Sequence, residues 1–202
     1  MKLQGGGIMR KIQKKVNVSK RMYNQIVRFA EYTHTKKSSV MAFWLFSQTE
    51  FFYHNQNMFL KEWKKRRYME EPILANGWEF QGKDKPEYRR VTFYISDDLD
   101  KKIQEIEAWL QMRSGANELE QNELIVNLLR MSEKDSVAIK RFLPALNKSI
   151  SDEEVDTIVK FNSSKKFASD IKGLADKIGI TRNDLISFII LDYFISYHIR
   201  ND

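Results

Sequence analysis

The sequence predicts a mainly α-helical protein with short β-strands, built as three tandem β-α-α units. Three observations support this prediction. Short stretches in which apolar and polar residues alternate, typical of half-buried strands, occur three times along the chain. Each is followed by a small polar residue that can cap a helix, and then by two segments with apolar residues at helical spacing. The spacing between the cap and the apolar positions is the same each time.

Three serines set this common spacing. Ser19, Ser96 and Ser164 each stand three residues before the first apolar helix position and seven before the second. Those positions are Met22, Leu99 and Phe167, followed by Ile26, Ile103 and Ile171. A fixed internal spacing that recurs is the sequence signature of a repeated structural unit. We therefore expect each serine to cap the first helix of its unit.

The first unit spans residues 9–54. Val16 and Val18 alternate with polar residues in its strand, and after a polar turn Thr35 is expected to cap its second helix. Residues 55–87 form a connector, with one helix and a loop rich in proline, glycine and tryptophan.

The second unit spans residues 88–131 and the third residues 155–202, with a second connector at 132–154 between them. In the third unit, Gly179 is expected to end the first helix and Thr181 to open the second. This last helix is apolar on most sides, so we expect it to be buried.

Positive charge is concentrated at the N-terminal end. Residues 1–70 contain 15 Lys and Arg against 4 Asp and Glu, a net charge of +11, whereas the whole chain carries +7 and the remainder therefore −4. The usual partner of such a cationic end is a polyanion. A solvated surface that only keeps the protein soluble is the simpler alternative.

A single strand followed by two helices leaves its strand edge unpaired, so two units are expected to pair their strands antiparallel in front of four helices. This arrangement resembles the ribbon-helix-helix family of repressors, the Arc- and MetJ-type β-ribbon readers of DNA. The resemblance covers the three units and excludes both connectors. It implies three tandem ribbon-helix-helix units and double-stranded DNA as the partner.

The resemblance also implies that outward-facing strand residues contact base edges in the major groove. Amide and basic side chains suit paired hydrogen bonds with adenine or guanine. In the third unit Ile158 occupies one such position and does not suit base contact. The matching positions that remain are Gln13, Lys15 and Asn17; Arg90, Thr92 and Tyr94; and Lys160 and Asn162.

A further implication is that backbone N–H groups at the start of each second helix hold a DNA phosphate. The candidates are Thr35, Lys36, Lys37 and Ser38 in the first unit, and Thr181 and Arg182 in the third. Ordinary helix capping would explain the two threonines equally well. In the second unit Glu120 and Glu123 would repel a phosphate.

A basic run follows the first unit and is interleaved with aromatic residues. It contains Lys64, Lys65, Arg66 and Arg67, with Trp63 beside it. On a helix this run could bind the DNA backbone. It could equally be a solvated face with the tryptophan turned into the core.

No catalytic, metal or cofactor motif is found in the sequence. There is no cysteine, and the three histidines, His34, His54 and His198, lack metal-ligand spacing. Neither a P-loop nor a dinucleotide-binding motif is present. The N-terminus lacks the apolar region of a secretory signal, and the longest apolar run is too short to span a bilayer. We expect a cytoplasmic protein that is no enzyme, with no membrane contact.

The resemblance to the ribbon-helix-helix family implies a sequence-specific DNA-binding protein, a transcriptional or copy-number repressor of a plasmid, phage or mobile element. The alternative is a relaxosome accessory protein of conjugation, or a partition protein, that binds origin DNA and recruits a protein partner through the acidic second and third units. A third possibility is a structural, antitoxin-like interaction module with incidental charge. Because three units are an odd number, we expect two to pair within the chain and the third to pair with a second copy in a homodimer.

Overall fold

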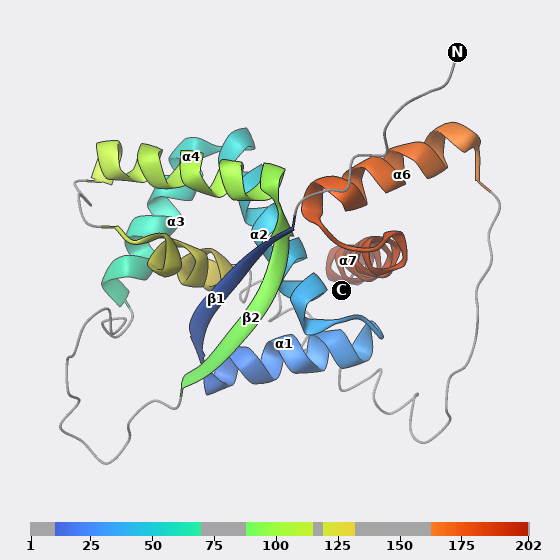
Figure 1. Ribbon diagram of the computed structural model, residues 1–202, viewed down its shortest axis with the longest axis horizontal. Coiled ribbons are helices and arrows are strands. Elements are labelled where there is room, and N and C mark those ends of the chain that lie inside the picture. Colours follow the sequence, from blue (N-terminus) through green and yellow to red (C-terminus); the bar gives the residue numbers. More distant parts are fainter. Residues whose placement is uncertain (1–10, 70–87, 115–118, 132–162, 202) are drawn as a thin grey trace.

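The computed structural model describes residues 11–69, 88–114, 119–131 and 163–201 of the chain. These residues are mostly helical and contain one two-stranded antiparallel sheet (Figure 1). The elements are β1 (Lys11–Ser19), α1 (Lys20–Tyr32), α2 (Lys37–His54), α3 (Gln56–Met69), β2 (Tyr88–Ser96), α4 (Asp97–Ser114), a helix at 121–131, α6 (Lys165–Ile178) and α7 (Arg182–Asn201).

The sheet is a ribbon made by the first two expected strands. β1 and β2 run antiparallel over their whole lengths, with Lys11 opposite Ser96 and Ser19 opposite Tyr88. Val16 and Val18 of β1 and Val91, Phe93 and Ile95 of β2 face the helices and are buried, whereas the residues that alternate with them on the outer side are exposed. The alternation expected from the sequence is thus confirmed in both strands. The expected third strand lies outside the described residues.

The register of the ribbon relates its two strands by an approximate two-fold axis. Lys15 faces Thr92, and each of these residues stands four positions before the serine that caps the next helix. Positions at equal distances from the two caps are therefore related across the centre of the ribbon.

The three expected serine caps are confirmed. The hydroxyl oxygens of Ser19, Ser96 and Ser164 each accept a hydrogen bond from the backbone N–H three residues later, at 3.1–3.2 Å. Thr181 caps α7 in the same way, accepting from the N–H of Asp184 at 3.1 Å. Gly179 ends α6 in the left-handed conformation, with φ of 90°, as expected.

The expected cap of the first unit's second helix is wrong. Lys36 is the N-cap of α2, and its side chain makes no capping bond. Thr35 instead completes the end of α1: its N–H donates to the carbonyl of Ala30 at 2.9 Å, and its hydroxyl lies 2.8 Å from that of Thr33. The chain turns tightly at His34, whose φ is 51°, so the backbone of Thr35 bonds to the end of α1 and this residue does not cap α2.

One hydrophobic core joins all the described elements, and the α6–α7 pair belongs to it. Phe188 of α7 stacks on Phe43 of α2, with ring centroids 4.7 Å apart, and also contacts Phe29 of α1. The expectation that the last helix is buried on most sides is only partly right. Among the described side chains of α7, Leu185, Phe188 and Leu191 are buried, whereas Ile189 and Ile190 are 41% and 62% exposed.

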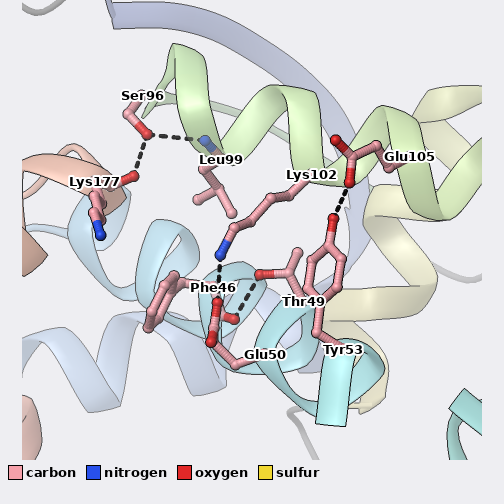
Figure 2. A network of polar contacts seen from close by, with 9 residues as sticks. All are labelled: Phe46, Thr49, Glu50, Tyr53, Ser96, Leu99, Lys102, Glu105 and Lys177. Carbon is pink, nitrogen blue, oxygen red and sulfur yellow. Dashed lines mark hydrogen bonds and ion pairs between the residues drawn. The ribbon is translucent and has the colours of Figure 1, made fainter. Parts of the chain in front are cut away.

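Polar contacts also tie the elements together at the end of the ribbon and between α2 and α4 (Figure 2). The Ser96 hydroxyl, besides capping α4, donates to the carbonyl of Lys177 at the end of α6. Between α2 and α4, Lys102 pairs with Glu50 and the Tyr53 hydroxyl donates to Glu105. Desolvation and the Glu105 carboxylate raise the pKa of Tyr53, so its phenol remains the donor.

Candidate nucleic-acid interface

The outer side of the ribbon, which we call the ribbon face, gathers six of the eight expected base-reading residues. All six are exposed, because their positions alternate with the buried apolar ones. In cross-strand pairs they are Gln13 with Tyr94, Lys15 with Thr92, and Asn17 with Arg90. The other two, Lys160 and Asn162, lie outside the described residues.

Most polar groups of the ribbon face are available to a ligand. Gln13 donates from its amide nitrogen to the Tyr94 hydroxyl at 3.0 Å. Within the parts of the chain that the structure describes, Lys15, Asn17 and Arg90 make no side-chain hydrogen bond or ion pair. Neither strand contains an acidic residue. The face is therefore positively charged and rich in hydrogen-bond donors.

A lysine on the inner side of β1 was not expected from the sequence. Lys14 occupies one of the inward positions of the strand, and its ammonium forms a 2.5 Å ion pair with Asp100 of α4. It also donates to the side-chain oxygen of Gln121 at 2.8 Å. The Lys14 and Asp100 side chains are only 10% and 8% exposed. The only signal in the sequence is a lysine at a position where the alternation favours an apolar residue.

Glu107 lies near this buried pair, further along α4. Its partial burial raises the pKa of its carboxyl, and the negative charge of Asp100 acts in the same direction, while Lys14 opposes them. The ion pair with Asp100 holds Lys14 on the inner side of β1, so this lysine does not contribute to the ribbon face.

Two of the expected phosphate sites come together beside the ribbon. The Ser39 hydroxyl of α2 donates to the Asp184 carboxylate of α7 at 2.7 Å, so the starts of these two helices are neighbours. The candidates there are the half-buried Thr35 and Ser38 and the exposed Lys36, Lys37, Thr181 and Arg182. This meeting of sites from the first and third units could not be expected from their separation in sequence.

The starts of α2 and α7 carry basic side chains and one carboxylate, whose effects on a bound anion are opposite. Lys37 points to Tyr23 of α1, donating to its hydroxyl at 3.1 Å with the ammonium 5.3 Å from the ring centre. Asp184 places a carboxylate among the basic residues, which weakens the attraction for an anion. Lys36 and Arg182 remain exposed.

The start of helix 121–131 has the opposite character. Glu120 is exposed and Glu123 half-buried, and Gln121 is occupied by Lys14. The acidic start expected from the sequence is therefore accessible to solvent.

The basic run after the first unit is not brought to the start of α2. It lies on α3, which follows the opposite end of α2, about 27 Å of helical rise away. Trp63 is 1% exposed and stacks on Phe59, so the tryptophan is part of the core. Lys64 is exposed, while the side chains of Lys65, Arg66 and Arg67 lie outside the described part.

Among the described residues, no group of histidine, aspartate and glutamate side chains could hold a metal ion. In the same residues, no helix has the length and apolar character needed to cross a membrane.

Comparison of the chain with protein-family models, with curated proteins and with solved structures finds no match.

Proposed function

We propose that this chain is a sequence-specific double-stranded DNA-binding protein whose first two β-α-α units pair as the two halves of a ribbon-helix-helix module. The observation that carries the proposal is the ribbon face: six exposed residues of base-reading type lie side by side on an antiparallel ribbon that has no acidic residue.

The shape of the ribbon supports the proposal. A two-stranded ribbon fits the major groove of B-DNA, which is about 12 Å wide, and its outer side chains then reach the base edges. Asn17 suits adenine and Arg90 suits guanine, each through two hydrogen bonds. The helices behind the ribbon hold its curvature and register, since the buried residues of both strands pack into their common core.

The exposed lysines at the start of α2 support contact with the DNA backbone beside the ribbon. Lys36 and Lys37 lie where helix N–H groups are directed outwards, an arrangement that favours a phosphate. In this proposal the third unit is a further copy of the same pattern, and it pairs with its equivalent in a second chain. The cellular role we favour is that of a repressor encoded by a plasmid, phage or mobile element.

The test is binding of fluorescently labelled duplexes, first from a random-sequence pool and then of the selected sequence, measured by anisotropy at several salt concentrations. We expect affinity to fall steeply with salt, because phosphate contacts release counterions. Asn17→Ala should weaken binding to the selected duplex by about 1–3 kcal/mol and relax its sequence preference.

Asn57→Ala on α3, which removes an asparagine that is also exposed but lies away from the ribbon, serves as the control and should leave binding unchanged. Binding that does not depend on salt would contradict the proposal and favour a protein-interaction module. Unchanged discrimination by Asn17→Ala would show that the ribbon face is not the reading surface.

A further inference from the structure

We propose that the ribbon reads a non-palindromic DNA site, with one half-site specified by Asn17 and Arg90 and the other by Gln13 and Tyr94. This inference rests on the proposed DNA-binding function and adds the class of site that is recognised.

The two-fold relation of the strands is the starting point. Its axis passes between Lys15 and Thr92, which face each other at equal distances from the caps Ser19 and Ser96. A ribbon made of two identical strands would present the same residues to both halves of its site, and such a module matches a palindrome. Here the strands are parts of one chain and have diverged.

The divergence affects every reading position. By distance from the caps, Gln13 corresponds to Arg90, Lys15 to Thr92, and Asn17 to Tyr94. No equivalent pair keeps the same side chain.

The half of the ribbon near Ser19 carries the stronger specifying groups. Asn17 faces Arg90 across the strands, and both side chains are exposed and free of internal hydrogen bonds among the described residues. An asparagine and an arginine that are free in this way can each make two hydrogen bonds to one base, to adenine and to guanine respectively. We therefore expect this half-site to contain a defined adenine and a defined guanine.

The half of the ribbon near Ser96 carries a different pair. The amide nitrogen of Gln13 donates a hydrogen bond to the Tyr94 hydroxyl at 3.0 Å, so the two side chains lie in contact and form a continuous surface. Tyr94 is 45% exposed and offers its ring edge as well as its hydroxyl. Such a surface suits apolar contact with a thymine methyl group, together with one remaining amide contact. The two half-sites therefore differ in sequence.

The helix starts on the two sides of the ribbon also differ in charge. The start of α2 is held beside α7 by the Ser39–Asp184 hydrogen bond, while helix 121–131 lies on the other side of the ribbon (Figure 1). The starts of α2 and α7 carry the exposed Lys36 and Arg182 beside one carboxylate, Asp184, whereas the start of helix 121–131 carries Glu120 and Glu123 and no basic residue. Backbone contact is thus favoured along one wall of the groove and opposed along the other.

The experiment selects duplexes from a random-sequence library with the full-length protein, and then builds two palindromes, each by duplicating one half of the selected site. We expect a non-palindromic consensus, and both palindromes should bind more weakly than the selected duplex. The palindrome that duplicates the half-site of Gln13 and Tyr94 loses the paired contacts of both Asn17 and Arg90, each worth about 5- to 150-fold in affinity, and should bind the more weakly of the two. A palindromic consensus, or a palindrome that binds as tightly as the selected duplex, would overturn the inference and leave DNA binding intact. Failure to enrich any sequence would overturn the proposed function itself.

Three variants test the assignment of the halves. Selection with Asn17→Ala and with Arg90→Ala should relax the same half-site, although the two residues come from different strands. Gln13→Ala should relax the other half-site. All three residues are exposed, so thermal unfolding should be unchanged and serves as the folding control. Relaxation of opposite half-sites by Asn17→Ala and Arg90→Ala would refute the assignment.

Discussion

Replacing Lys14 with methionine is expected to lower the free energy of unfolding by about 3 kcal/mol, because it leaves the Asp100 carboxylate buried without its counter-charge. The two side chains are 10% and 8% exposed and 2.5 Å apart. Breaking such a pair costs about 3–5 kcal/mol, and the lower end applies here since Asp100 keeps its 3.1 Å hydrogen bond from Gln104. Gln121 also loses its donor.

The double variant Lys14→Met with Asp100→Leu should recover most of that loss and unfold within about 1 kcal/mol of the wild type, since both desolvation costs disappear together. Equilibrium urea unfolding of the wild type, both single variants and the double variant measures the coupling between the two residues. Lys101→Met on α4, the helix that carries Asp100, is the control. Because its ion pair with Asp97 is exposed, this variant should change the free energy of unfolding little.

Two results would refute this reasoning. If Lys14→Met alone is as stable as the wild type, removing the lysine does not leave a buried, uncompensated charge on Asp100. If the single losses simply add in the double variant, Lys14 and Asp100 act independently. The double variant should also bind DNA like the wild type, because Lys14 faces the helices and not the ribbon face.

Three further predictions concern other parts of the chain. Gly179→Ala should destabilise the protein by about 2–3 kcal/mol, because a Cβ at this left-handed residue would lie 2.8 Å from the backbone nitrogen of Ser96. Gly173→Ala, at a position of α6 where a Cβ would meet no other atom, should stabilise the protein by about 0.5–1 kcal/mol. Thermal unfolding measures both changes. Because burial raises the pKa of Glu107, the folded protein binds this proton more tightly than the unfolded chain and loses stability as pH rises through the carboxyl's titration range. Glu107→Gln should remove that loss, so its stability relative to the wild type increases with pH in urea unfolding; a constant difference would contradict the assignment. Lys36→Ala with Lys37→Ala should weaken binding to all DNA sequences alike and reduce the slope of log affinity against log salt by about one for each phosphate that the variant no longer binds, and an unchanged slope would exclude this helix start as a backbone-binding site.

Features that depend on neighbouring residues follow from the sequence alone. The serine caps, the left-handed Gly179 and the alternation in both strands all result from local hydrogen bonds, local sterics and the two-residue period of a strand. For the same reason the six outward residues of β1 and β2 could be named before their partners were known. Thr35 shows where this reasoning stops, because a threonine before a helix can equally end the preceding one, and the turn at His34 decides between them.

Which distant residues meet depends on the tertiary structure. Three expected strands allow several pairings, and no local pattern says that β1 pairs with β2 with Lys15 opposite Thr92. The burial of Lys14 depends on Asp100, 86 positions away, because a lysine can stay inside only where a carboxylate compensates for its lost hydration. The meeting of the α2 and α7 starts likewise depends on how the helices pack around the common core. Local chemistry set the elements, and long-range packing set the surface they form together.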